Sequence, residues 1–447
     1  MRRIVYVMFF LVFVNENYMM YNGLWKTHMW IVDQLLFEQS PLKLPLFFLI
    51  QCGLLFVASR KPAANKGFAA PVKLGLNLCL TCAVGWTLWG AFKGGSPKMA
   101  GWQLYPLVSA MLFAKLLIAT LRTPKHFETL GKLLMAAALY RSMMAIIFWF
   151  FFVHNVIYEK GPPPYMTTHD DTVLFVVGLV LSLNNALVKQ TAKALRFAVM
   201  SWALILPAIQ FNNRRLAWAS LGFALVLVYF LMPRGRVKRK MNWGLVALAP
   251  MLAGYVAIGW GRPEGIFKPL RSFSTMTTEK DSSTLAREAE NKGLLATLTR
   301  GSWITGTGWG HEYVEIDSSF SIAAFYKEWR YVPHNSLIGA LAFTGVIGFS
   351  CLWLIFPISV FLNSRTWRIS RDPTERVASL TAITQVIICS NQMFGDMGLQ
   401  SLTTVFMAGS GFAVAARLSV TSGAWPENKR RLKHAEASRI PPQNVAA

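Results

Sequence analysis

The sequence predicts an all-α integral membrane protein with about twelve transmembrane helices. Three observations lead to this fold class. Of the 447 residues, 54% are hydrophobic and 13% aromatic. The apolar residues come in long blocks, close to the ~20 residues that a helix needs to span a bilayer. The formal net charge of +24 is concentrated in the connections between those blocks.

The expected spans follow one another with short connections between most of them. The first is interrupted by Asn15, Glu16 and Asn17, and the second is short for a membrane helix. The spans are 4–20, 43–58, 72–92, 103–121, 133–153, 172–188, 195–211, 216–232, 243–260, 337–362, 376–393 and 398–417.

The basic residues predict which connections share a side of the membrane. If Arg2 and Arg3 are cytoplasmic, every second connection faces the cytoplasm, and each of these is basic, as the positive-inside rule requires. They lie at 60–66, 122–132, 189–193, 234–240, 365–376 and 429–431. Both termini are then cytoplasmic. The positive charge is explained by orientation and by contact with membrane lipids, so it does not indicate a nucleic-acid partner.

Four regions follow from this topology. Residues 1–260 hold helices one to nine, 261–335 form a long loop domain on the outer face, 336–420 hold helices ten to twelve, and 421–447 form a disordered cytoplasmic tail. Long structured loops usually carry function. Within the loop domain, capping residues and leucine spacing predict a helix over 283–300. Its apolar stripe, expected to face the membrane domain, is formed by Leu285, Leu294, Leu295 and Leu298.

The first candidate site residue is His334, in the run YVPHNS at 331–336 that closes the outer loop and opens an apolar span. Imidazole can exchange a proton near neutral pH. The first turn of a helix offers unpaired N–H groups that favour an anion. One place therefore combines a possible base with a possible phosphate site. The alternative is that Asn335 or Ser336 simply caps the helix while His334 lies at the lipid headgroups.

Arginines on the same face are the second group of candidates. Arg214 and Arg215 oppose the charge rule, and charges at membrane depth are usually functional. Arg287 lies early in the loop helix, where the helix dipole disfavours a cation. Arginine suits phosphate because it presents a rigid fork of donors. The alternatives are that Arg214 and Arg215 extend to headgroups and that Arg287 pairs locally with Glu288 or Glu290. Arg300 has the weaker case, because a cation is favoured at a helix C-terminus.

The remaining motifs argue against nucleotide and metal chemistry. The turn GTGWG at 306–310 lacks the spacing of a nucleotide loop, and we interpret it as a tight turn that brings backbone close to a ligand or another helix. No group of His, Cys, Asp and Glu has metal-site spacing. We therefore expect no metal ion and no cofactor.

The order of these features resembles the O-antigen ligase and polymerase superfamily of bacterial envelopes. The similarity is sharpest over 205–350 and rests on outer-face arginines after span seven, an arginine-bearing loop helix, GTGWG, and PHNSLIGALAFTGVIGF from 333. The resemblance implies a glycosyltransferase-C-type fold in the bacterial inner membrane. It also implies metal-independent, inverting transfer of glycan from an undecaprenyl-pyrophosphate carrier to an acceptor glycan or glycolipid, at the periplasmic face.

Residue roles are also implied by this resemblance. His334 and Arg287 match the family's histidine and loop arginine and are the expected catalytic residues. Arg214 or Arg215 matches the arginine at the start of span eight, and the doubled arginine leaves open which one. The expected substrate-binding residues are therefore Arg214, Arg215, Arg300 and Asn335.

Several functions remain open at this level. Family motifs are shared by polymerases of lipopolysaccharide or exopolysaccharide and by ligases that act on lipid A core. Polymerase function, which we favour, would add a glycan flippase and a chain-length regulator as partners. Outside the family, a glycolipid transporter or flippase has a similar span count. A transporter would place charges near the membrane midplane, often with internal repeats, whereas here the charges cluster on one face.

Overall fold

The fold is all-helical in the part of the chain that the computed structural model describes, and no strand occurs there. The described residues are 1–14, 45–61, 66–153, 167–212, 214–260, 262, 265–267, 270, 282–317 and 327–426. The proposed tail beyond residue 426 and most of the loop at 154–166 lie outside them.

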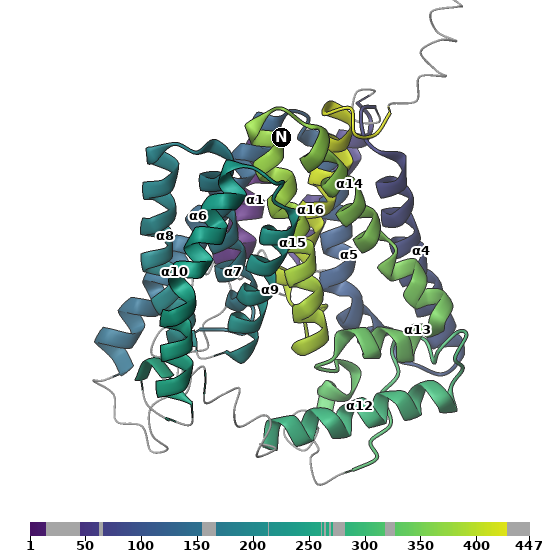
Figure 1. The fold of residues 1–447 in the computed structure, drawn as a ribbon. Coiled ribbons are helices and arrows are strands. Elements are labelled where there is room, and N and C mark those ends of the chain that lie inside the picture. The colour runs from purple at the N-terminus through teal and green to yellow at the C-terminus, as the bar shows by residue number, and fades with distance from the viewer. Residues whose placement is uncertain are drawn as a thin grey trace, which may run out of the picture.

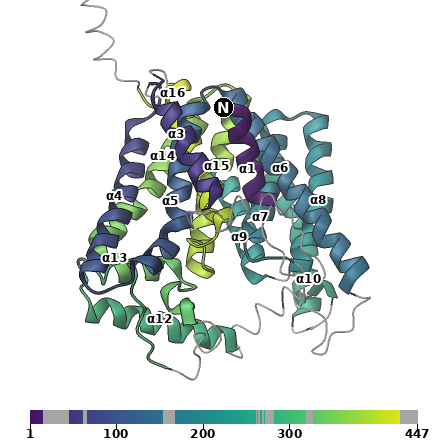
Figure 2. The ribbon, with the colours of Figure 1, turned by 180° about the vertical axis from the view of Figure 1, so that it is seen from behind.

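The helices run mainly up and down one bundle (Figures 1 and 2). The first half of the chain contains α1 (Arg2–Val14), α3 (Leu46–Ser59), α4 (Ala70–Phe92), α5 (Pro97–Thr120), α6 (Pro124–Ile147), α7 (Asp171–Lys189) and α8 (Ala192–Asn212). The second half contains α9 (Arg215–Leu231), α10 (Arg236–Gly259), α12 (Ser282–Arg300), α13 (Ser336–Trp353), α14 (Ile355–Ile369), α15 (Pro373–Gly395) and α16 (Leu402–Thr421).

The expectation of about twelve spans is confirmed in part. Among the described residues every expected range contains a helix, but only nine helical stretches of the described chain are long and apolar enough to cross a membrane. One of the nine is the continuous stretch Ser336–Ile369, which contains both α13 and α14. Of the others, α3 and α9 are apolar but shorter, and α1 has 13 described residues.

The expectation of one straight helix over 337–362 is wrong. The chain bends at Gly345, whose φ of 60° is the left-handed conformation that glycine adopts readily. The bend frees backbone donors, and Val346 and Ile347 donate instead to the carbonyls of Trp303 and Ile304 at 2.9 and 3.2 Å. The first half of α13 therefore lies across the end of the bundle, next to α12 (Figure 1).

The two ends of the bundle differ in their chemistry. The basic connections gather at the end where α1 begins and α16 finishes, hereafter the basic end (Figure 1). There Arg417 donates to the carbonyl of Lys66, and Lys189 pairs with Glu128. The opposite end, hereafter the α12 end, is covered by α12 and its flanking turns (Figure 2). The alternation of connections that the charges predict is thus present in the fold.

The glycine-rich turn docks the segment that follows α12 onto α4. Gly308 has a φ of 91°, and a Cβ there would lie 2.3 Å from the Cα of Gly90, so only glycine permits this approach. Gly308 also donates to the carbonyl of Phe343 at 2.7 Å, and Trp309 donates to that of Trp86 at 3.1 Å. Of the two interpretations of this turn, the approach to another helix is the one observed.

The predicted loop helix is present as α12, and most of its expected stripe faces inward. Leu294 and Leu298 are fully buried, whereas Leu295 is 45% exposed, so including Leu295 in the stripe was wrong. Leu295 follows Leu294 directly, and neighbouring residues point about 100° apart on a helix, so both cannot face the same surface.

A buried ion pair ties α6 to the start of α7. Arg141 donates through Nε and Nη2 to the two carboxylate oxygens of Asp171, both at 2.8 Å, and both side chains are almost completely buried. Asp171 also accepts from the backbone of Thr168. The pair therefore fixes the short segment 168–171, which carries His169 at the α12 end.

Replacing Arg141 with methionine is expected to destabilise the protein by about 3–5 kcal/mol, because the buried carboxylate of Asp171 then has no cationic partner. Unfolding of the detergent-solubilised protein by heat or denaturant measures this. The double variant Arg141→Met with Asp171→Leu should recover much of the lost free energy of unfolding. A single variant as stable as the parent would show that the pair contributes nothing.

Candidate functional site

His334 is held at the α12 end by a buried glutamate. Its Nδ1 lies 3.3 Å from Oε2 of Glu290, and its backbone N–H donates to Oε1 of the same carboxylate at 3.1 Å. The side chain of Glu290 is only 3% exposed and that of His334 is 16% exposed. Because a carboxylate accepts, Nδ1 carries a hydrogen and Nε2 remains as the acceptor nitrogen. The pair is thus arranged as a base with an orienting partner.

The backbone on both sides of His334 is also fixed. Its carbonyl accepts from Met397 at 2.6 Å, and the Ser336 hydroxyl accepts from the backbone of Leu399 at 3.2 Å. Met397 has a φ of 48°, an uncommon conformation for a residue other than glycine. The turn after α15 is therefore bonded directly to the segment that carries the histidine.

Asn335 has a local structural role. Its side-chain oxygen accepts from the backbone N–H of Ile338 at 3.1 Å, which caps α13, and the residue is 5% exposed. This is the capping alternative that the sequence offered. The cap uses the amide oxygen and leaves the two amide N–H donors, so the expected substrate contact stays a prediction.

A second group of charges surrounds Asp396, which follows α15 directly. His169 bonds through Nδ1 to one carboxylate oxygen, and Nη2 of Arg287 lies 3.7 Å from the other. Nη1 of Arg287 donates to the carbonyl of Gly395 at 2.8 Å. The Arg287 side chain is 41% exposed, so part of its donor set still faces outward.

The charge state of Asp396 follows from its neighbours. Burial raises the pKa of its carboxyl, but the hydrogen bond and charge of His169 and the charges of Arg287 and Arg214 outweigh this, so the pKa lies below its ordinary value. Asp396 is therefore an anion at neutral pH. Because the folded-state pKa is depressed, the stabilisation is present above the ordinary pKa and is lost as the pH falls through the folded-state value.

Arg214 and Arg215 lie at the start of α9, at the same end of the bundle. Arg214 occupies the N-cap position, and its positive charge acts on Asp396. The next turn packs against the end of α15, since a Cβ on Gly395 would lie 3.0 Å from Cδ2 of Leu216. The tertiary structure thus brings Arg214 towards Arg287, although 72 residues separate them in the sequence.

The two charged groups are neighbours on α12. Arg287 and Glu290 are three residues apart, so they lie on one face of the helix with Cβ atoms about 5–6 Å apart. Arg287 reaches Asp396 while Glu290 reaches His334. The alternative in which Arg287 pairs with Glu290 is not observed, because the Glu290 carboxylate contacts His334.

Arg300 is not brought to this group. It is exposed and ends α12, whereas Arg287 lies near the other end of that helix. Thirteen residues at about 1.5 Å each place the two Cα atoms about 20 Å apart. The geometry therefore gives Arg300 no place beside His334 or Asp396.

Three residues of the site were missed from the sequence: Glu290, Asp396 and His169. Asp396 had a usable signal, since it is an acid in the short turn 394–397 between two apolar spans on the outer face. No sequence signal pointed to Glu290 or His169, because their partners His334 and Asp396 are 44 and 227 residues away in the chain. Within the described residues, no three His, Cys, Asp or Glu side chains are grouped so that they could hold a metal ion.

The arrangement combines an oriented imidazole with the fixed guanidinium group of Arg287 and the positive charge of Arg214 at one end of a membrane bundle. Such a site can remove a proton from a hydroxyl and neutralise a polyanionic leaving group.

Comparison with known proteins connects this geometry to one family. Residues 199–353 match the model of the O-antigen ligase family. No curated protein matches the chain. The matched region contains His334, Glu290 and the four candidate arginines, whereas His169 and Asp396 lie outside it. The chain is therefore a multi-pass membrane protein whose residues 199–353 are similar to the O-antigen ligase family.

Proposed function

We propose that the protein is an inverting glycosyltransferase that transfers glycan from an undecaprenyl-pyrophosphate carrier to an acceptor hydroxyl. The observation that carries the proposal is the His334–Glu290 pair, one helical turn from the Arg287–Asp396 group. In this proposal the fold is of the glycosyltransferase-C type, the α12 end faces the periplasm, and the segment 261–335 is the loop domain that covers the reaction.

The acceptor is activated by His334. Nε2 takes the proton of the acceptor hydroxyl as its oxygen attacks the anomeric carbon. Glu290 accepts from Nδ1, holds the ring in one orientation and stabilises the imidazolium that forms. Attack from the side opposite the leaving group inverts the anomeric centre.

The leaving group is stabilised by arginine. As the bond between the anomeric carbon and the phosphate oxygen breaks, its electron pair remains on the pyrophosphate, where negative charge grows. Arg287 is orientated by Asp396 and by the carbonyl of Gly395, and its outward-facing donors can bind phosphate oxygens. Arg214 adds positive charge from α9, and Arg215 follows it in the chain.

Reconstitution tests the function. Purified protein in liposomes, supplied with a lipid-linked oligosaccharide, should release undecaprenyl pyrophosphate and extend or transfer the glycan. A ladder of products that are still lipid-linked would identify a polymerase, and transfer to lipid A core would identify a ligase. Movement of intact donor across the bilayer, with no new glycosidic bond, would overturn the proposal and favour a flippase.

Transfer should persist after exhaustive chelation, because the groups proposed to neutralise the pyrophosphate are guanidinium ions. The measurement is the initial rate in excess chelator, compared with the rate after a divalent ion is added back. A chelated enzyme that is inactive, and is restored by the ion, would contradict the role assigned to the arginines.

A further inference from the structure

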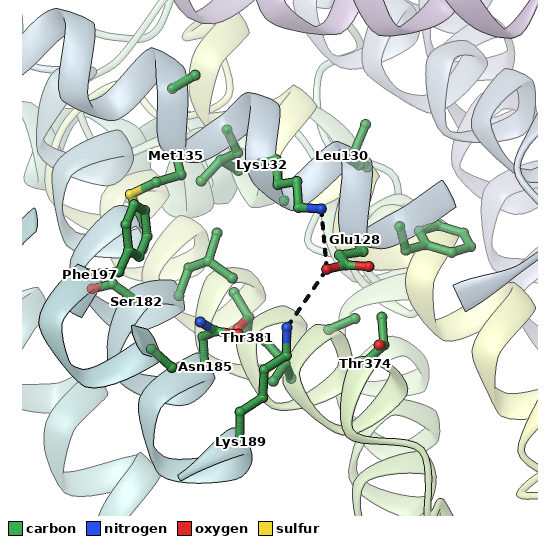
Figure 3. Close-up of a pocket in the computed structure, with 18 of the residues that line it drawn as sticks. Glu128, Leu130, Lys132, Met135, Ser182, Asn185, Lys189, Phe197, Thr374 and Thr381 are labelled. Atoms are coloured by element: carbon green, nitrogen blue, oxygen red, sulfur yellow. Dashed lines mark ion pairs between the residues drawn. The ribbon is translucent and has the colours of Figure 1, made fainter. Parts of the chain in front are cut away.

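A cavity of about 630 Å³ (Figure 3) is lined by residues near the basic end, and His334 lies at the opposite, α12 end. It is partly open and is lined by residues of α1, α6, α7, α8, α15 and α16, and none of the proposed reaction residues lines it. Nothing in the proposed transfer reaction uses this space.

The wall of the cavity is apolar. Leu130, Leu134 and Leu181 line it, and several of its polar side chains are bonded to protein. Gln385 donates to the hydroxyl of Ser410 at 2.6 Å, and the Thr381 hydroxyl accepts from Asn184 at 3.1 Å. Because these groups are satisfied internally, the cavity presents mainly hydrocarbon to whatever enters it.

The mouth of the cavity is positively charged. Glu128 lies between Lys132 and Lys189, with N–O distances of 3.3 and 3.7 Å (Figure 3). Lys193 also lines this region. Three ammonium groups and one carboxylate leave an excess of positive charge, and the Lys132 side chain is 71% exposed. An anionic headgroup would therefore find complementary charge here.

The depth of the cavity corresponds to one leaflet. Its lining on α6 runs from Phe127 to Leu139. Twelve residue steps at about 1.5 Å give about 18 Å, which is roughly half of the ~30 Å hydrocarbon thickness. A chain that enters beside the lysines would end near the middle of the bilayer, as an acyl chain does.

We propose that this cavity binds an anionic glycerophospholipid from the leaflet at the basic end. Its phosphate would lie at the mouth beside Lys132, Lys189 and Lys193, whose combined charge exceeds that of Glu128, and one acyl chain would lie against Leu130, Leu134 and Leu181. Basic pockets between membrane helices are known to take such headgroups. A phospholipid fits better than the polyprenyl carrier, because the carrier's pyrophosphate would be used at the opposite end of the bundle.

Native mass spectrometry of the delipidated full chain tests the site with phosphatidylglycerol and phosphatidylcholine as probes. Phosphatidylglycerol should bind at least about tenfold more tightly than phosphatidylcholine. The double variant Lys132→Gln with Lys189→Gln should bind phosphatidylglycerol about tenfold more weakly than the parent does. Ala136→Phe, which narrows the cavity without changing charge, should weaken binding of both lipids. If it also lowers the melting temperature, Gly131→Ala is the milder variant, since its Cβ would meet Leu181 at an ordinary 3.7 Å.

The matched control is Lys61→Gln with Lys66→Gln, which removes the same charge from exposed lysines at the same end of the bundle that do not line the cavity. Its affinity for phosphatidylglycerol should stay near that of the parent. Equal affinity for the two lipids, or an equal loss in the control pair, would overturn the proposal. So would displacement of bound phosphatidylglycerol by equimolar undecaprenyl phosphate, which would assign the cavity to the carrier.

Discussion

Replacing His334 with glutamine is expected to reduce the turnover of glycan transfer by about 10²–10⁴-fold, the range that a general base contributes. Glutamine can still donate to Glu290, so the buried carboxylate keeps a partner, but an amide cannot take the acceptor's proton. His334→Ala should be equally inactive. The measurement is the single-turnover rate of purified variants with lipid-linked donor, alongside their melting temperatures.

The matched control is His311→Gln, on the same outer segment. His311 contacts the carbonyl of Gly90 and lies outside the charged groups, so its loss should leave the rate near that of the parent. Glu290→Gln separates positioning from structure, since it should lower kcat while leaving KM for the donor nearly unchanged. Near-normal turnover of a folded His334→Gln protein would remove the histidine from the mechanism.

Replacing Arg287 with glutamine is expected to reduce turnover by about 10²–10³-fold, as for the loss of a fixed electrostatic stabiliser. Arg287→Lys should recover only part of this, because an ammonium group lacks the planar fork that bonds Gly395 and faces Asp396 together. The rate of release of undecaprenyl pyrophosphate is the measurement. The same pair of substitutions at Arg214 and then Arg215 would show which of the two contacts the pyrophosphate.

Two residues of α12 serve as references for Arg287. Lys292→Gln removes an exposed cation from the same helix and should have little effect. Arg300→Gln tests the sequence-based expectation that Arg300 binds substrate. The geometry predicts a far smaller loss of turnover for this variant than for Arg287→Gln. If Arg287→Lys is as active as the parent, the planar guanidinium group of Arg287 does not bind the leaving group. Only the role of His334 as the base then remains.

The sequence predicted the helical class and most helix positions. These depend on local properties, because apolar length and capping residues act within one segment of the chain. It was wrong at Gly345, where the break in the span depends on whether Trp303 and Ile304 can accept from the freed backbone donors. That acceptor segment belongs to a distant turn, so no local pattern could reveal it.

By itself the sequence determined that this is a membrane protein with its reactive candidates on one face, and it selected His334 and the arginines by type and place. Tertiary structure alone decided their partners. In the folded protein Glu290 pairs with His334, and Asp396 pairs with Arg287 and bonds to His169. Arg300 lies about 20 Å from Arg287 along α12. The reason is physical: charge and apolar length are carried by each segment separately, whereas an ion pair between two helices depends on how those helices pack and on which face each one turns towards the other.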